Sequence, residues 1–138
     1  MQLPVTEAAS QKMTKSEGDK KMTTINLTKE EFLNKVMDYE SNPTEWKYKG
    51  DKPAIIDFYA SWCGPCQRLA PIIDELANEY EGRVDIYKVD VDSEEELARL
   101  FKVRSIPTLV YIPTEGLPIV ELGGKGKGEL KEKLDALK

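Results

Sequence analysis

Residues 54–80 read AIIDFYASWCGPCQRLAPIIDELANEY, and this stretch contains both cysteines of the chain. Its first seven residues are apolar except for Asp57, which predicts a buried β-strand over 54–60. Apolar residues then recur at helical spacing, which predicts a helix that begins near Pro65 and ends at Gly82. The two cysteines therefore lie at a junction between a strand and a helix.

The segments on either side continue the alternation of strands and helices. Strands are predicted over 23–27, 84–92, 108–112 and 118–123, and further helices over 28–40, 93–103 and 128–138. The order β-α-β-α-β-α-β-β-α predicts an α/β protein with a central sheet that is covered by helices on both faces. The final pair of strands forms a hairpin, so the sheet is expected to be mixed.

Two of the predicted helices begin with the same capping pattern. Thr28 is followed three residues later by Glu31, and Ser93 is followed three residues later by Glu96. A Ser or Thr side chain followed at this spacing by Glu is typical of a capped helix N-terminus. We therefore expect Thr28 and Ser93 to be N-caps.

The length and composition indicate one globular domain. The chain has 138 residues, a net charge of −5 and no histidine. The acidic balance argues against a nucleic-acid partner, and no apolar run approaches the ~18 residues that span a membrane. Residues 1–22 have no periodicity and many polar residues, so we expect a disordered N-terminal tail before a domain over 23–138.

The two cysteines allow four interpretations: a buried packing pair, half of a metal site, a structural disulfide or a redox centre. A zinc site needs further ligands, and the chain has no histidine to supply them. A disulfide that closes so small a loop constrains the unfolded chain only weakly. A CxxC motif between a strand and a helix is the context of a redox motif.

Redox chemistry explains the placement of both thiols. Cys63 precedes the helix, where unpaired N–H groups and the helix dipole favour a thiolate and lower the thiol pKa. Cys66 lies one turn further along, where it can attack a mixed disulfide formed at Cys63. Gly64 permits close backbone approach, and Pro65 stiffens the turn and starts the helix.

The sequence resembles the thioredoxin family. The segments DFYASWCGPC, SIPT and ELGG occur in the family's order and spacing, and the resemblance covers 23–138. It implies a central mixed five-stranded sheet flanked by four helices, and an enzyme that reduces protein disulfides by dithiol–disulfide exchange. The resemblance further implies that Cys63 and Cys66 form the redox-active disulfide, with Cys63 as the exposed nucleophile and Cys66 as the buried resolving thiol.

The resemblance also assigns the surface that contacts a substrate. The peptide bond before Pro107 is expected to be cis, and the backbone of Ile106 to pair with an extended substrate chain. The alternative for Pro107 is an ordinary loop proline. The expected contact residues around the sulfur atoms are Trp62, Gly64, Pro65, Ile106, Pro107 and Gly123.

Asp57 is the single charge in an apolar run. If both faces of the sheet are covered, this carboxyl is buried and its pKa is raised. In a chain without histidine, Asp57 is then the best candidate to accept the proton of Cys66. The resemblance implies that Lys88 lies nearby and tunes Asp57. The alternative for Asp57 is a carboxylate at a strand edge that reaches solvent. The alternative for Lys88 is an ordinary exposed lysine.

Two other functions remain open at this point. A disulfide oxidase or isomerase of the same fold usually carries other residues between the cysteines, often histidine. A non-catalytic binding module of this fold would have no need for intact cysteines, Asp57 and Pro107. The interpretation that the residues favour is a protein-disulfide reductase.

The expected partners follow from this function. They are proteins that contain disulfides and a reductase that supplies electrons. That reductase is a flavin-dependent enzyme that uses NADPH if the protein is cytoplasmic, or a membrane electron carrier if it is exported. We expect a monomer that binds no cofactor itself, because no glycine-rich dinucleotide motif follows a strand. Residues 1–22 lack the apolar core of a signal peptide, yet a tether left after export would explain them, so a periplasmic location is weighed against a cytoplasmic one.

Overall fold

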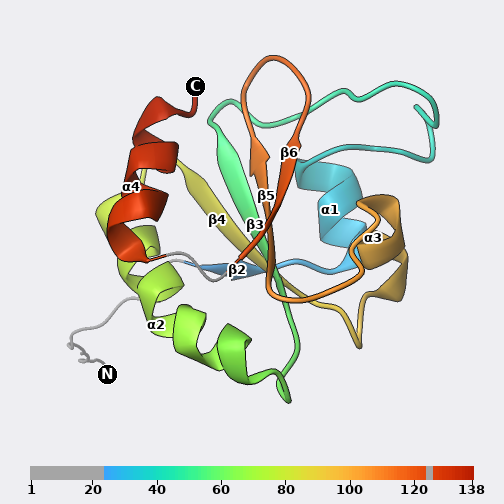
Figure 1. Ribbon diagram of the computed structural model, residues 1–138. Coiled ribbons are helices and arrows are strands. Elements are labelled where there is room, and N and C mark those ends of the chain that lie inside the picture. Colours follow the sequence, from blue (N-terminus) through green and yellow to red (C-terminus); the bar gives the residue numbers. More distant parts are fainter. Residues whose placement is uncertain (1–23, 124–125) are drawn as a thin grey trace, which may run out of the picture.

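The computed structural model describes residues 24–123 and 126–138 and has a five-stranded sheet with four helices (Figure 1). The strands are β2 (Ile25–Asn26), β3 (Ala54–Tyr59), β4 (Asp85–Asp90), β5 (Thr108–Ile112) and β6 (Ile119–Leu122). The helices are α1 (Lys29–Lys35), α2 (Gly64–Glu79), α3 (Glu95–Leu100) and α4 (Lys127–Ala136). The predicted order of elements is confirmed. The predicted tail over 1–22 lies outside the described residues.

The sheet has the order β2-β4-β3-β5-β6 and is mixed. β3 lies in the middle, parallel to β4 and antiparallel to β5, and β6 continues antiparallel at the edge. Five of the six residues of β3 are buried, because helices cover both of its faces. The apolar run over 54–60 is therefore the central strand of the molecule.

Each face of the sheet has its own hydrophobic core. On one face, residues of β3 such as Ile56 and Phe58 pack with Phe32 of α1 and Leu97 of α3. On the other face, Ile55 packs with buried residues of α2 and α4, including Leu69, Ile73, Leu76, Leu130 and Leu134. Figure 1 shows α2 and α4 on one side of the sheet and α1 and α3 on the other. Asp57 follows Ile56 on β3, so its side chain faces the side of α2 and α4.

One of the two predicted caps is confirmed and the other is wrong. The hydroxyl oxygen of Thr28 accepts a hydrogen bond from the backbone N–H of Glu31 at 3.2 Å, and α1 begins at the next residue. At α3 the N-cap residue is Glu94, whose side chain makes no capping bond to α3, and Ser93 lies outside the helix. The backbone N–H groups of Ser93 and Glu94 both donate to the Asp90 carbonyl, so a turn after β4 moves the start of α3.

The helices are shorter than their sequence patterns predicted. α1 ends at Lys35, because the backbone N–H groups of Val36 and Met37 both donate to the Phe32 carbonyl and the chain then turns. α2 contains Pro71 and ends at Glu79, three residues before Gly82, which has a φ of +85°. Among the described residues, none of the helices is long and apolar enough to span a bilayer.

Candidate active site

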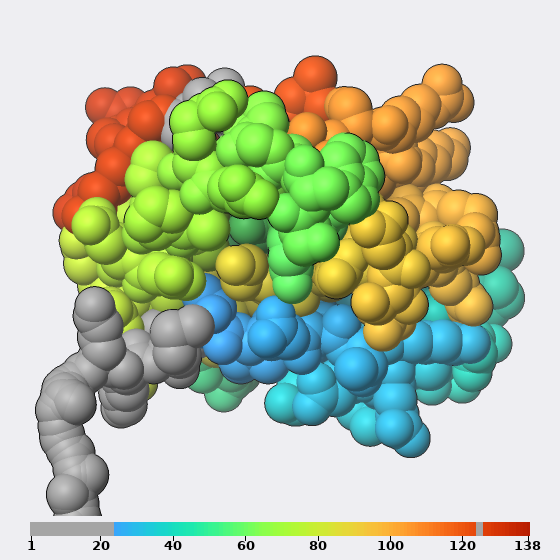
Figure 2. All heavy atoms as spheres, turned by 90° about the horizontal axis from the view of Figure 1, so that it is seen from below, coloured from blue at the N-terminus to red at the C-terminus, as the bar shows by residue number. Residues whose placement is uncertain are grey.

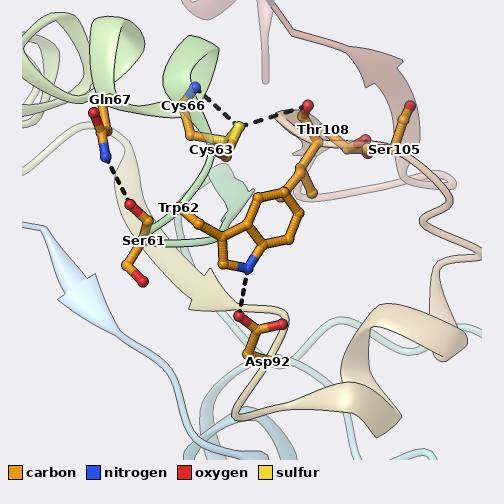
Figure 3. Close-up of a disulfide and its surroundings, with 9 residues drawn as sticks. Ser61, Trp62, Cys63, Cys66, Gln67, Asp92, Ser105 and Thr108 are labelled. Atoms are coloured by element: carbon orange, nitrogen blue, oxygen red, sulfur yellow. Dashed lines mark hydrogen bonds between the residues drawn. A yellow bond between two sulfur atoms is a disulfide. The ribbon is translucent and has the colours of Figure 1, made fainter.

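The junction of β3 and α2 carries a disulfide between Cys63 and Cys66, with their Cα atoms 5.2 Å apart. Cys63 is the N-cap residue of α2, and its sulfur accepts a hydrogen bond from the backbone N–H of Cys66 at 3.2 Å. Figure 3 shows this contact at the end of the helix. A backbone N–H and the helix dipole at this position stabilise a thiolate when the disulfide is reduced.

The two sulfur-bearing residues do not differ in exposure as expected. Cys63 is 5% exposed and Cys66 is 3% exposed, so both are buried, and the expectation of an exposed Cys63 is not met. Cys63 packs with Ile106 from the loop before β5 and with Ala60 from the end of β3. In this structure, the position at the helix end distinguishes Cys63 from Cys66, and solvent exposure does not.

The loop before β5 lies against the disulfide. The peptide bond between Ile106 and Pro107 is cis, as predicted. The Cys63 sulfur lies 3.8 Å from the carbonyl oxygen of Ile106, which is 43 residues away in sequence. The Thr108 hydroxyl donates to the Ser105 carbonyl at 2.5 Å and ties the loop together. Residues from two distant segments thus meet at one sulfur atom.

Gly123 packs closely against Pro107. Its backbone N–H donates to the Pro107 carbonyl at 2.8 Å. A Cβ atom at this position would lie 2.9 Å from the Pro107 ring, closer than real contacts allow. A Cβ at Gly64 would meet only the far end of Arg68, at 3.8 Å. Glycine is therefore required at 123 by the fold, whereas at 64 the fold itself leaves room for a side chain.

Trp62 stands out from the surface beside the disulfide. It is 68% exposed, and its indole N–H donates to the Asp92 carboxylate at 2.8 Å (Figure 3). Figure 2 shows this face, where green residues at the start of α2 lie beside the yellow segment that follows β4. Asp92 was not predictable as a residue of the site, because no local pattern relates residues 30 positions apart.

Gln67 was also missed as a residue of the site. Its side-chain amide donates to the Ser61 carbonyl at 2.6 Å and so joins the first turn of α2 to the loop that leads into Cys63. Figure 3 shows this bond on the side of the helix away from Trp62. An amide one residue after a CxxC motif was the available signal, but its partner was not predictable.

Asp57 is buried, as predicted, with 2% of its surface exposed. Burial raises the pKa of its carboxyl to about 6, the positive charge of Lys88 opposes this rise, and the nearby carboxylate of Asp74 adds to it. Lys88 is the register partner of Asp57 on β4, and its ammonium lies 4.8 Å from the centre of the Tyr59 ring. Lys88 is therefore beside Asp57, as the resemblance implied.

A cavity of about 150 Å³ connects Asp57 with the disulfide. It is lined by Asp57, Tyr59, Ala60, Ser61, Cys66, Gln67, Ala70 and Lys88. One carboxylate oxygen of Asp57 is buried and has no hydrogen-bond partner among the described residues. One carboxylate oxygen of Asp74, two turns after Cys66 on α2, is also buried and has no hydrogen-bond partner among the described residues. No sequence pattern indicated Asp74 as a residue of the site. Asp57 and Cys66 therefore border the same cavity.

Comparison with known proteins agrees with this geometry. The thioredoxin family model matches residues 23–136 of the chain. The chain belongs to the thioredoxin family. It is 50% identical over 99 residues to a thioredoxin of Borreliella burgdorferi, an alignment that covers 72% of this chain and 84% of that protein. It is 35% identical to thioredoxin C-2 of Corynebacterium nephridii, over 82% of this chain and 94% of that protein.

One further relative is a larger protein. The chain is 43% identical over 81 residues to a bifunctional thioredoxin reductase/thioredoxin of Mycobacterium leprae, over 58% of this chain and 18% of that protein. With the family and the Cys63–Cys66 disulfide established, the protein is a thiol–disulfide oxidoreductase that reduces protein disulfides. Within the described residues, no cluster of three or more potential ligands is arranged to hold a metal ion.

Proposed function

We propose that Cys63 is the nucleophile of this reductase and Cys66 the resolving thiol. The observation that carries the proposal is the place of Cys63 at the N-cap of α2, where its sulfur faces the Cys66 N–H at 3.2 Å. In the reduced protein, the Cys63 thiolate attacks one sulfur of a substrate disulfide. A mixed disulfide forms at Cys63, and the other substrate sulfur leaves as a thiolate.

Asp57 then accepts the proton of Cys66. The Cys66 thiolate attacks the Cys63 sulfur, the substrate leaves with its second thiolate, and the Cys63–Cys66 disulfide remains. Two electrons have passed from the protein to the substrate. This role of Asp57 is supported by its burial, by its raised pKa of about 6 and by the cavity that it shares with Cys66. Lys88 tunes the charge of Asp57 from the neighbouring strand.

The substrate contacts an apolar surface around the sulfur atoms. We assign this surface to Trp62, Gly64, Pro65, Ile106, Pro107 and Gly123. The exposure of Trp62 and the open space at Gly64 support the assignment. The backbone of Ile106, beside the Cys63 sulfur, would pair with an extended substrate segment. Because the contact is mostly apolar and backbone-directed, the enzyme would accept many disulfide-bearing proteins as substrates.

A thioredoxin reductase would return electrons to the Cys63–Cys66 disulfide. The name of the Mycobacterium leprae relative, which joins the two activities, supports such a partner. We expect a flavin-dependent reductase that uses NADPH if the protein is cytoplasmic, and a membrane electron carrier if it is periplasmic. The chain would act as a monomer that binds no cofactor itself. The periplasmic prediction rests on residues 1–22, outside the described part of the chain, and cell fractionation is the measurement that decides it.

A trapping experiment tests the roles of the two cysteines. In Cys66→Ser, the mixed disulfide cannot be resolved, so we expect a stable 1:1 adduct with a substrate protein, visible by non-reducing electrophoresis and mass spectrometry. Cys63→Ser should give no such adduct. If Cys63→Ser instead trapped the substrate and Cys66→Ser did not, the two roles would be reversed.

The reduction potential tests the direction of electron flow. Trp62 is close to the disulfide, so its fluorescence during titration with a thiol–disulfide buffer reports the fraction reduced. The reduction potential known for the thioredoxin family is about −270 mV. We expect a similar potential for the Cys63–Cys66 couple. A potential near about −120 mV, which is typical of a strong oxidant of this fold, would contradict the reductase function.

A further inference from the structure

The exposed apolar side chains of the described residues are concentrated on the last hairpin. Leu117, Ile119, Val120 and Leu122, here called the β6 strip, are between 48% and 72% exposed. Among the described residues, the other large exposed apolar side chains are Trp62 beside the disulfide and Leu100 on α3. Exposed apolar side chains that gather on one element commonly mark an interaction surface.

β6 is an edge strand with backbone groups directed outwards. Its partner is β5, and no strand of the described residues pairs with its other side. The Gly123 N–H donates to the Pro107 carbonyl, and hydrogen-bonded pairs alternate along an antiparallel ladder. Glu121 and Ile119 therefore face β5, whereas Val120 and Leu122 direct their N–H and C=O groups away from the sheet. Such groups can pair with an added strand.

Both faces of an added strand would meet apolar surface. On one face lie the side chains of Val120 and Leu122, because alternate residues of a strand share a face. On the other face is a hollow of about 190 Å³ beside Ile119. It is lined by Tyr111, Ile119, Glu121, Lys133, Ala136 and Leu137. The matching occupant is an extended segment with apolar side chains on both faces.

The β6 strip is continuous with the redox site. Leu122 precedes Gly123, and the backbone N–H of Gly123 donates a hydrogen bond to the carbonyl of Pro107, beside the disulfide. From Gly123 to Ile119 the strand spans about 14 Å, at ~3.4 Å for each residue. A polypeptide whose cysteine is bound at Cys63 can therefore reach the strip with residues close to that cysteine in sequence.

We propose that β6 binds an extended apolar segment of the disulfide-bearing substrate protein, which adds to the sheet as a sixth strand. The inference rests on the proposed function, because it gives that substrate a second contact outside the residues around the sulfur atoms. Main-chain bonds to Val120 and Leu122 supply affinity, and the apolar surface on either face supplies preference. The substrate is favoured over a second copy of the chain because the strip begins at the redox site.

The test uses the 138-residue chain and two peptides with one disulfide each. One peptide has Val, Ile and Tyr beside its cysteines, and the other has Gly and Ser. In Val120→Lys, we expect KM for the apolar peptide to rise about five- to tenfold with kcat unchanged, and the polar peptide to be reduced as by the wild type. Leu100→Lys, which places the same charge at an exposed apolar residue on α3, should behave as the wild type.

Two variants separate strand addition from simple apolar contact. Val120→Pro removes an N–H that points away from β5, so the ladder within the protein is kept while one bond to the added strand is lost. We expect it to raise KM for the apolar peptide as well. Val120→Thr keeps a β-branched side chain and should give a smaller rise, and it serves as the test if the other variants do not fold. Equal KM values for Val120→Thr and the wild type, or for Val120→Lys and the wild type, would overturn the proposal.

Two controls keep this result separate from the proposed function. Reduction of a small aromatic disulfide, dithiobis(nitrobenzoate), needs no strip and should be unchanged in each variant. If the wild type did not reduce this small disulfide, the proposed function itself would be contradicted. If sedimentation instead showed a wild-type dimer that Val120→Lys dissociates, with peptide kinetics unchanged, the strip would bind a second copy and the proposal would be wrong.

Discussion

Asp57 lies in the middle of β3 with 2% of its surface exposed, and burial raises the pKa of its carboxyl from 3.8 to about 6. Between these two pH values the folded protein binds more protons than the unfolded chain. Stability therefore falls as the pH rises through this window, and the ionised carboxylate is unfavourable for folding at neutral pH. A group that destabilises the fold in this way is consistent with a role in the reaction.

The first prediction concerns the stability of Asp57→Asn. Removing the buried charge should raise the free energy of unfolding at pH 7 by up to about 3 kcal/mol, because burial raises the pKa of this carboxyl from 3.8 to about 6. The variant should also lose most of the pH dependence between pH 4 and 6. Urea denaturation at four pH values measures both. A variant with the wild-type pH dependence would contradict the assignment of this pKa.

The second prediction concerns the kinetics of the same variant. Asp57→Asn should slow release of the mixed disulfide by tenfold or more at neutral pH, because Cys66 loses its proton acceptor. In the wild type, the release rate should fall below about pH 6 as Asp57 becomes protonated. Stopped-flow fluorescence measures the release. Asp51→Asn, at an exposed aspartate, is the matched control, and equal rates in the two variants would exclude Asp57 as the acceptor.

The third prediction compares two glycines. Gly123→Ala places a Cβ atom 2.9 Å from the Pro107 ring, so it should destabilise the protein by about 1–3 kcal/mol and raise KM for protein substrates. Gly128→Ala, in α4 with open space around the new atom, should stabilise it by about 0.5–1 kcal/mol. Thermal unfolding and insulin reduction measure these effects. Equal effects of the two substitutions would show that the contact with Pro107 is not restrictive.

At the scale of elements, the same local pattern has two outcomes. Thr28 and Ser93 are each followed by Glu at the spacing of a capping box, but only Thr28 caps a helix. At α3, the side chain of the N-cap residue Glu94 does not cap the helix. Its carboxylate accepts a hydrogen bond from the backbone N–H of Lys29 at 3.0 Å. The start of α3 is therefore joined to the start of α1 by a side chain that does not cap α3.

The fourth prediction follows from this difference. Thr28→Ala should lower the free energy of unfolding by about 1 kcal/mol, because the Glu31 N–H loses its partner. Ser93→Ala should change it by less than about 0.5 kcal/mol, since Ser93 does not cap α3. Chemical denaturation of the two variants measures both values. A larger loss in Ser93→Ala than in Thr28→Ala would contradict the observed caps.

At the scale of the whole molecule, the two cores and the sheet lie within the part of the chain that the family model matches. Both faces of β3 are filled by residues between Leu27 and Leu134. Lys127 and Lys131 of α4 each bond to Glu79 of α2, which joins the last helix to the helix that carries the disulfide. These contacts of the described residues join the helix that carries the disulfide to the last helix of the chain.

The fifth prediction tests the predicted domain boundary. A chain that begins at residue 23 should keep the melting temperature of the 138-residue chain within a few degrees and should reduce insulin at the same rate. The reason is that the described core residues all follow residue 23. Calorimetry and the insulin assay measure the two properties. A large loss of either would show that residues 1–22 contribute to the domain, contrary to the prediction.

Much of the fold and the positions of the two cysteines were predictable from local sequence. The apolar run over 54–60, the helical spacing after Pro65 and the cap at Thr28 each reflect interactions between residues a few positions apart. The positions of Cys63 and Cys66 at the start of α2 follow from the same local patterns. These features depend on backbone periodicity, which the sequence records directly.

The remaining features were decided by the tertiary structure. The sequence by itself determined a strand–CxxC–helix unit in an α/β chain, and resemblance to a family added the cis proline. The contact of Cys63 with Ile106, the bond from Trp62 to Asp92 and the cavity that joins Asp57 to Cys66 each needed the folded chain. These contacts join residues on separate elements, and their distances are set by strand order, register and helix packing, which no local pattern encodes.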